Sequence, residues 1–485
     1  MTGMFRLSGK RRLPGTLSLD GPDTTLHLWD DAAASLNDDA HDETITGILG
    51  DRKLVTLLGC ILNDGRTNFG RGGTAKHYYI FPHHVVIGDR FVSRDDADIE
   101  NISYVFEDAP RLFHDMESFR VRLGSTAQAK AVIQSLNPGT DLHVEETACV
   151  AYYTGKDELF SSDTELGRIS VRHSPTFGFG GPEGIRINNR IVTNIDFSTP
   201  LRFQEAISRM HRSVSFFELM VGRVQNLRDI SISWKGDDLP ITCDVCTTMY
   251  PRYDHSTRGV ESSFHDVLVD GARNPALLSR IASAWLRRHA SWRTARTMLL
   301  SGWKDIRSYN ADRLVRAANM YDLLPDTCFP DVPPLDGDLA VSVQKAKEMF
   351  QALPYSTDRD SILGALGRVG TLTLKRKIRY RAREISQLIG ERVPNIDRVA
   401  DEAVNLRNHF VHGSTSRIDY IDNSNLAAFL TDTLEFVFSV SDLLEAGWNI
   451  EDWVRRGPHP HHPFGSYLED YPENWKELNR LIDAG

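Results

Sequence analysis

The spacing of apolar residues changes near Pro200 in this 485-residue chain, and the change separates two kinds of expected structure. Before Pro200, short segments alternate apolar and polar residues between Gly, Pro and Asp turn signals, which is the pattern of strands. After it, apolar residues mostly recur every three or four positions, the spacing of one helix face. A chain of this length also exceeds one ordinary hydrophobic core. The sequence therefore predicts a multidomain α+β protein with a β-rich first part and a helical second part.

The β-rich part is expected to span residues 1–253 as an antiparallel sandwich or barrel. Its expected strands are bounded by turn signals, and they lie at residues 16–19, 25–29, 44–62 (two strands around a turn), 77–87, 117–123, 142–153, 168–173, 184–197, 229–234 and 240–245. One helix, near residues 200–225, interrupts this series. The polar, glycine-containing stretch Asp254–Ser263 is the expected linker to the next domain.

Residues 264–485 are expected to form an all-α domain, with a helical bundle at about residues 339–447. Runs of helical spacing lie at residues 275–300, 305–324, 339–353, 361–390, 396–413 and 425–447. In the fifth run, the expected core stripe consists of Ile396, Val399, Ala403 and Phe410, with Val404 and Val411 beside it. It is expected to end at Gly413, because glycine commonly stops a helix.

Bulk composition excludes several functional classes. The formal net charge is −10, so any nucleic-acid site must be a local basic patch on an acidic body. Five cysteines in this length do not make a disulfide framework. No apolar run follows the basic amino terminus, and no stretch approaches the roughly eighteen apolar residues of a membrane span. A cytoplasmic protein without membrane association is therefore expected.

The densest group of chemically active side chains lies in Leu406–Gly413, at the end of the fifth helical run. Asn408 and His412 are four residues apart and share a helix face, and Arg407 lies beside them. Arginine and asparagine in mid-helix are poor core residues unless they are paired, and a helix carboxyl end stabilises a protonated histidine. On the residues alone two interpretations stay open: a catalytic group, or a salt bridge, a loop contact and a helix cap.

A strongly basic helix is expected before this group, within residues 361–390. Five of its cations, with Lys375 beside them, are candidates for contact with an RNA backbone, and these are Arg376, Lys377, Arg379, Arg381 and Arg383. So many like charges on one helix repel one another, which favours a polyanion that lies across them. A solvated charged surface is the alternative interpretation.

Two further motifs have weaker functional interpretations. Cys243 and Cys246 have the two-residue gap of a zinc knuckle, and His255 or His265 would have to complete the ligand set at irregular spacing. Two small residues at the end of a strand are the alternative. The loop Gly70–Gly73 has the glycines of a phosphate-binding turn but lacks the flanking elements and the lysine of a P-loop, so a hairpin tip is expected there.

The polar group at the end of the fifth run resembles a known catalytic motif. Arg407, Asn408 and His412 match the Arg-x(4–6)-His motif of the HEPN superfamily of ribonucleases, many members of which place Asn directly after the arginine. The basic helix before the motif and the apolar helix after it also resemble a HEPN bundle.

The amino-terminal part resembles a family that carries such a bundle. Pro14–Leu19, Ile45–Gly47 and Val55–Cys60 are similar to the start of ApeA-type anti-phage proteins, which join a β-rich domain to a HEPN domain. Residues 200–360 contain no motif of this resemblance.

The resemblance implies a metal-independent endoribonuclease with no cofactor, in which Arg407, Asn408 and His412 are the catalytic residues. It implies an RNA substrate, transfer RNA being one candidate, and a homodimer or higher homo-oligomer that lines one cleft with two motifs. It further implies an abortive-infection effector whose β-rich domain senses a phage-derived trigger or holds the nuclease inactive. Two other functions stay open: a non-catalytic HEPN protein that dimerises or binds RNA or nucleotides, and a zinc-containing binding protein based on Cys243 and Cys246.

Overall fold

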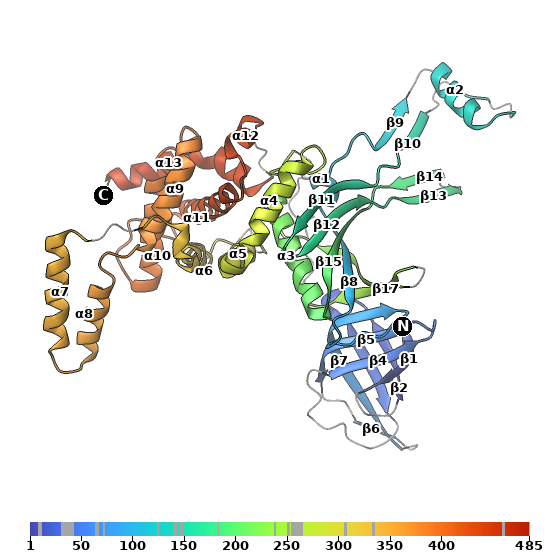
Figure 1. Cartoon of the computed structure of the whole chain (residues 1–485), viewed down its shortest axis with the longest axis horizontal. Helices are drawn as coiled ribbons and strands as arrows, with labels where there is room; N and C mark the ends of the chain where they lie inside the picture. Colours follow the sequence, from blue (N-terminus) through green and yellow to red (C-terminus); the bar gives the residue numbers. More distant parts are fainter. Residues whose placement is uncertain are drawn as a thin grey trace. The chain divides into compact units, whose positions relative to one another are not determined.

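The computed structural model describes residues 1–7, 12–30, 43–63, 67–70, 73–123, 126–139, 143–145, 149–182, 184–236, 239–249, 253, 265–304, 308–331, 335–457 and 461–484 (Figure 1). These residues form two compact units, Met1–Arg287 and Arg288–Gly485. The first is built on an antiparallel sheet and the second is helical, so the α+β multidomain prediction is confirmed. The expected linker Asp254–Ser263 lies outside the described residues.

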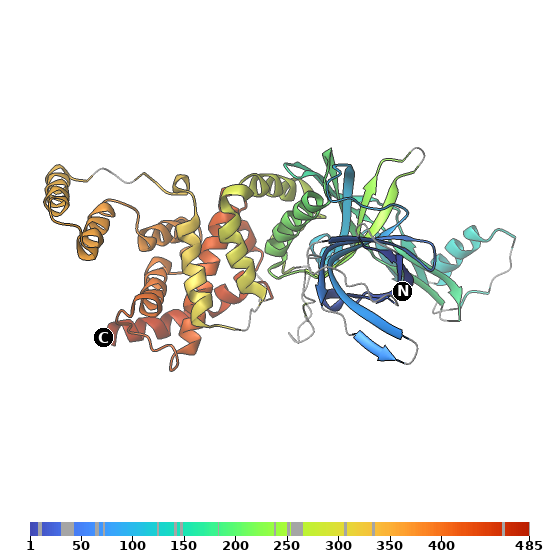
Figure 2. The same ribbon diagram turned by 90° about the horizontal axis from the view of Figure 1, so that it is seen from below.

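A closed antiparallel barrel occupies the start of the first unit (Figure 2). Its strands are β1 (Thr2–Arg6), β2 (Arg12–Ser18), β3 (Thr25–Asp30), β4 (Glu43–Leu49), β5 (Leu54–Asn63) and β7 (Gly73–Gly88). They pair in the order β7-β3-β2-β1-β4-β5, and the circle closes because β5 also pairs with β7. Alternate side chains point inward and make a core that includes Phe5, Leu17, Leu28 and Val55.

Strand β7 belongs to two structures. One part pairs with β3 in the barrel, and residues 84–88 pair with β17 (Ile241–Thr247) instead. The sheet then continues in the order β17, β16 (Leu227–Trp234), β8 (Ile99–Phe106), β15 (Ile191–Leu201), β12 (Gly167–His173) and β11 (Glu158–Thr164). One strand therefore extends the hydrogen bonding of the barrel into an open antiparallel sheet.

Smaller elements accompany this sheet. They are β6 (Thr67–Gly70), the hairpins β9–β10 (Phe119–Leu123 and Cys149–Tyr153) and β13–β14 (Thr176–Gly181 and Gly184–Asn188), and the short helices η1 (Gly21–Asp23), α1 (Ala109–Leu112) and α2 (Thr126–Leu136). The sequence patterns predicted no strand at β1 or β8. The first is short and contains Gly3, and Glu100 and Asn101 interrupt the apolar residues of the second.

Two longer helices pack on the open part of the sheet, α3 (Phe203–Val221) and α4 (Pro275–Arg287). Phe216 of α3 contacts Trp285 of α4, with ring centroids 5.6 Å apart. Ser279 of α4 donates a hydrogen bond to Ser162 of β11 at 2.9 Å. These contacts attach α4 to the first unit, although the sequence predicts a helical domain from residue 264 onward.

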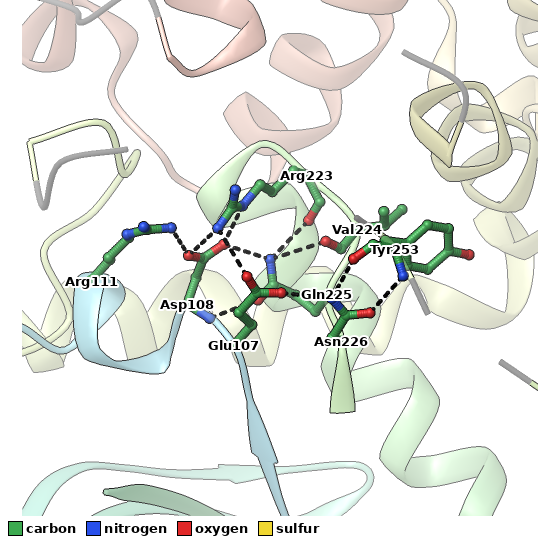
Figure 3. Close-up of polar contacts among 8 residues, drawn as sticks. All are labelled: Glu107, Asp108, Arg111, Arg223, Val224, Gln225, Asn226 and Tyr253. Atoms are coloured by element: carbon green, nitrogen blue, oxygen red, sulfur yellow. Dashed lines mark hydrogen bonds and ion pairs between the residues drawn. The ribbon is translucent and has the colours of Figure 1, made fainter. Parts of the chain in front are cut away.

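A buried carboxylate joins the end of β8 to the loop between α3 and β16 (Figure 3). Asp108 accepts two hydrogen bonds from Arg223, at 2.5 and 2.6 Å, and one from the amide of Gln225 at 2.9 Å, and it pairs with Arg111. Burial alone would raise the pKa of Asp108, but the hydrogen bonds and charge of Arg223 hold that pKa below its ordinary value. This group therefore stabilises the fold at neutral pH and loses that effect as the pH falls through the lowered pKa.

The second unit is a helical bundle around one central helix. Its elements are α5 (His289–Lys304), α6 (Ala311–Asn319), η3 (Met320–Leu323), η4 (Asp326–Cys328), α7 (Gly337–Gln351), α8 (Thr357–Gly367), α9 (Leu374–Ile389), α10 (Ile396–His412), α11 (Ser424–Glu445), α12 (Ile450–Arg455) and α13 (Pro463–Ala484). Helix α11 is buried at nearly every position from Leu426 to Leu443, and α6, α9, α10 and α13 pack against it. The helical run predicted at 361–390 is two helices, because Gly370, with φ of +85°, separates α8 from α9.

We expect Arg223→Ala to lower the free energy of unfolding of the first unit by about 3–5 kcal/mol, because it leaves the buried charge of Asp108 without its main partner. Native-state hydrogen exchange of the β8 and β16 amides measures this change in the intact chain. Arg190→Ala is the matched control, since Arg190 pairs with Asp229 at 3.0 Å near the surface, where such pairs contribute about 0–1 kcal/mol. Equal losses in the two variants would contradict the structural role of the buried pair.

Candidate functional site

Helix α10 carries the polar group that the sequence indicated as a site. Its buried face consists of Ile396, Val399, Ala400, Ala403, Val404 and Leu406. Gly413 follows the helix with φ of +65°, and its N–H donates to His409 O at 2.9 Å, so the glycine ends the helix as predicted. The last turn lies outside the packed core, where Phe410 and Val411 are 36% and 43% exposed. The prediction that Phe410 belongs to the core is therefore wrong.

Arg407 brings the predicted site residues together. Its Nη1 donates hydrogen bonds to Asn408 Oδ1 at 3.0 Å and to His412 Nε2 at 3.3 Å. A guanidinium only donates hydrogen bonds, so Nε2 of His412 is the acceptor in this contact. Arg407 and Asn408 are half-buried and His412 is exposed. The three side chains form one connected group at the surface, which offers a fixed cation, an amide and an imidazole.

Asn319 is a fourth member of this group, and the sequence did not indicate it. It is the last residue of α6, and its Oδ1 accepts a hydrogen bond from Arg407 Nη2 at 2.8 Å. Packing of α6 against α10 brings together these two residues, which are 88 positions apart. No spacing or motif connects them, so the contact follows from tertiary packing alone. His409, left out of the site by the sequence analysis, contacts Ser414 O at 2.6 Å.

Two sequence families match the chain over the parts described above. The family described as ApeA N-terminal domain 1 matches residues 1–285, which is more than half of the chain, and the family described as Apea-like HEPN matches residues 318–452. The chain belongs to the ApeA-type family. At the family level, ApeA-type proteins are anti-phage effectors that contain a HEPN domain, and HEPN domains are generally ribonucleases. No curated protein and no solved structure matches the chain.

The HEPN match of this ApeA-type chain includes the whole polar group. Asn319, near the start of the matched segment, and Arg407, Asn408 and His412, near its end, all lie within residues 318–452. The segment therefore contains all of α10 and the last two residues of α6, Ala318 and Asn319.

Helix α9 of the ApeA-type chain does not present its cations as one RNA-binding surface. Arg381 is 1% exposed, and its guanidinium pairs with Glu445 at 2.5 Å and with Glu384 at 3.3 Å. Lys377 is also buried and pairs with Asp322 at 3.4 Å. The prediction of RNA contact is corrected for these two residues, because their charged groups bind neighbouring carboxylates within the bundle.

The remaining predicted cations of α9 differ in exposure. Arg379 pairs with both carboxylate oxygens of Asp401, and its Nε lies 2.6 Å from Oδ1. Arg376 is exposed, and the side chain of Arg383 is 65% exposed and lies 3.7 Å from Asp397. Acidic partners on α10 thus offset the expected repulsion among the cations. Since Asp401 binds the guanidinium of Arg379, Arg376 and Arg383 remain the candidates for RNA contact on α9.

Cys243 and Cys246 do not face a common point. They lie three positions apart on β17, where successive side chains point to opposite faces of the sheet. Burial raises the pKa of both thiols, which disfavours the thiolate form that zinc binds. Within the described part of the chain, which includes His265, no three His, Cys, Asp or Glu side chains are grouped to hold a metal. His255 and the middle of the Gly70–Gly73 loop lie outside that part.

None of the helices among the described residues combines the length and the apolar character needed to cross a bilayer.

We expect Arg381→Ala to lower the free energy of unfolding of the helical unit by about 2 kcal/mol, because the bundle loses a fully buried side chain, while Glu445 keeps its ion pair with Arg288. Arg383→Ala is the matched control on the same helix, with an expected loss of about 0.5 kcal/mol or less. Hydrogen exchange of the α9 and α11 amides measures both changes. If the Arg381→Ala variant were as stable as the Arg383→Ala variant, the buried position of Arg381 would be contradicted, and Arg381 would again be a candidate for RNA contact.

Proposed function

We propose that the chain is a metal-independent endoribonuclease that acts as an abortive-infection effector. The observation that carries this proposal is the hydrogen-bonded group of Arg407, Asn408 and His412, which lies at the surface of the segment that matches the Apea-like HEPN family. Cleavage of RNA by its own 2′-hydroxyl needs a cation for the developing negative charge and a group that moves protons near neutral pH. Arginine and histidine supply these two functions.

In the proposed reaction the ribose 2′-oxygen bonds to the adjacent phosphorus, and the bond from phosphorus to the 5′-oxygen breaks. The 2′-hydroxyl gives up its proton and the 5′-oxygen gains one, so the products are a 2′,3′-cyclic phosphate and a 5′-hydroxyl. His412 transfers protons, since its neutral Nε2 is an acceptor when Arg407 releases it. Arg407 binds the phosphorane oxygens, and Asn408 orients the phosphate or the histidine. Asn319 acts through Arg407 as a positioning residue.

The proposed active form is a homodimer or larger homo-oligomer in which two copies of the motif line one cleft around the RNA substrate. Transfer RNA is a candidate substrate. The β-rich unit, which matches ApeA N-terminal domain 1, senses a phage-derived trigger or keeps the nuclease silent in uninfected cells. Such control is needed because a constantly active ribonuclease would kill its host.

We expect Arg407→Ala and His412→Ala each to abolish protection of a bacterial host against phage and to slow RNA cleavage by at least about 100-fold, because each removes a group required in the transition state. Purified protein and total RNA in EDTA provide the cleavage assay. Wild-type protection by either variant, or cleavage that requires added Mg²⁺, would contradict the mechanism. RNA binding without any cleavage by the triggered wild type would favour the non-catalytic HEPN alternative.

Asn319→Ala gives a graded test in the same assay. It removes the hydrogen bond to Arg407 Nη2 but keeps the guanidinium, so kcat should fall by about 10-fold with little change in KM. Asn310→Ala is the matched control, because Asn310 caps the other end of α6 by accepting from Arg313 N at 2.8 Å. The control should lose about 1 kcal/mol of stability and keep its kcat. Equal slowing of both variants would mean that stability of α6, and not the position of Arg407, limits the reaction.

We expect the double variant Arg376→Glu/Arg383→Glu to bind RNA more weakly, because the two exposed cations of α9 are proposed to contact phosphates. The slope of log affinity against log salt should decrease by about 0.7 for each lost contact. Titration of RNA binding at several salt concentrations measures this slope. Arg455→Glu is the charge control, since Arg455 is 75% exposed on α12. An unchanged slope in the double variant would remove α9 from the RNA-binding surface.

A further inference from the structure

A cavity of about 130 Å³ lies within the helical unit, and none of Arg407, Asn408 and His412 lines it. Its lining comes from the end of α5, the segment from Tyr309 into α6, the middle of α11 and the start of α13. A protein cavity of roughly 150 Å³ holds one molecule the size of benzene. This cavity therefore has room for a ligand of about five or six non-hydrogen atoms.

Aromatic rings form the apolar walls of the cavity. Trp303 of α5, Phe436 of α11 and Phe464 of α13 line it and are otherwise buried. The rings of Phe436 and Phe464 meet edge to face, with centroids 5.4 Å apart. Tyr309 completes the walls. Cages of aromatic rings bind organic cations, because ring faces attract positive charge. The walls therefore suit an organic cation better than an anion.

One carboxylate is the accessible charged group of the cavity. Asp432 accepts hydrogen bonds from the hydroxyl of Tyr309 at 2.8 and 2.9 Å, and its side chain remains 34% exposed. Arg313 and Glu435 also line the cavity, but they bind each other through two hydrogen bonds of 2.8 Å and are nearly inaccessible. A charged ligand in the cavity therefore meets Asp432.

The negative charge of Asp432 is incompletely offset. Arg313 is the one cation that the described residues place within 4.0 Å of Asp432 or Glu435, so two carboxylates share one guanidinium. That guanidinium lies 2.8 Å from Glu435 but 3.6 Å from Asp432. Burial and the charge of Glu435 raise the pKa of Asp432 to about 7, although Arg313 opposes this effect. A cation beside Asp432 would balance the charges of the group.

A metal ion does not suit this group of side chains. Protein metal sites combine several carboxylate, imidazole or thiolate ligands, and the described residues offer no trio of His, Cys, Asp or Glu that could coordinate one. A guanidinium ion uses both features of the cavity. Its planar fork donates paired hydrogen bonds to a carboxylate, and its face stacks on aromatic rings.

We propose that a small guanidinium compound binds in this cavity, with its charge against Asp432 and its plane against the aromatic walls. Five non-hydrogen atoms, as in methylguanidinium, match the size of the cavity. The proposal does not depend on the ribonuclease reaction, because the cavity is separate from the residues proposed to catalyse it.

Binding of methylguanidinium and of methylurea to the full-length chain tests the proposal, because the two molecules share a shape and differ in charge. Methylguanidinium should bind saturably with a Kd below about 10 mM, and at least about 10-fold more tightly than methylurea. At about ten times its Kd, it should slow exchange of the most protected α11 amides by about 10-fold, since it binds only the folded unit. Absence of saturable binding, or equal binding of the two molecules, would overturn the proposal.

Asp432→Asn separates the charge of the cavity from its shape. The variant keeps an acceptor for Tyr309, so it should bind methylguanidinium at least about 10-fold more weakly and methylurea as wild type does. Asp452→Asn is the matched control, because Asp452 is 47% exposed on α12 and lies outside the cavity. The control should bind as tightly as wild type. Unchanged affinity in Asp432→Asn, or equal weakening in both variants, would show that the ion does not bind at Asp432.

Capped arginine, N-acetylarginine amide, distinguishes a free guanidinium compound from the side chain of a protein partner. It carries the same charged group on a backbone that exceeds the size of the cavity, so it should bind at least about 10-fold more weakly than methylguanidinium. Binding of capped arginine as tightly as methylguanidinium would overturn the assignment of a free small molecule and indicate an arginine side chain of a protein.

Discussion

Arginine–carboxylate pairs along one side of α11 fix the arrangement of the helical unit. The pairs, each from a different helix, are Arg313 of α6 with Glu435 (2.8 Å), Arg296 of α5 with Asp442 (2.7 Å) and Arg381 of α9 with Glu445 (2.5 Å). Glu435 and Asp442 are buried, and the exposed Glu445 pairs with the buried guanidinium of Arg381, so each pair supplies the partner of a buried charge and favours one position of its helix. One of these helices, α6, also presents Asn319 to Arg407. The geometry of the surface group therefore depends on ion pairs in the core.

The first unit depends on a different constraint, the continuity of backbone hydrogen bonding through β7. This strand closes the barrel with β3 and β5, and its last residues begin the open sheet with β17. A barrel has no free edge, whereas an open sheet has edges that need cover. Helix α4 packs along β11, the last strand of the open sheet, and α3 packs on β8 and β15. The barrel and the open sheet are thus one continuous hydrogen-bonded sheet, which closes on itself in the barrel and is covered by helix α4 at its open end.

Residue spacing along the sequence predicted the elements that depend on contacts between neighbouring residues. Alternation placed most strands, Gly413 ended α10, and one helical turn held Arg407, Asn408 and His412 together. The predictions failed where a distant partner decides the outcome. The sequence presents Arg381 as one more surface cation, because its carboxylate partner comes much later in the chain. The sequence does not indicate Asn319 either, since its contact with Arg407 exists only after α6 packs on α10.

Under the proposed function, the hydrogen bond between Arg407 and His412 affects when His412 can act as a base. While Nη1 donates to Nε2, the lone pair of that nitrogen is engaged in the hydrogen bond with Arg407. A phosphate that attracts the guanidinium releases the imidazole, so under the proposed function the arrival of substrate itself creates the base. The same two side chains would then mask each other in the empty site. Under the proposed function, the reactivity of His412 therefore depends on occupancy of the site and ends when the product leaves.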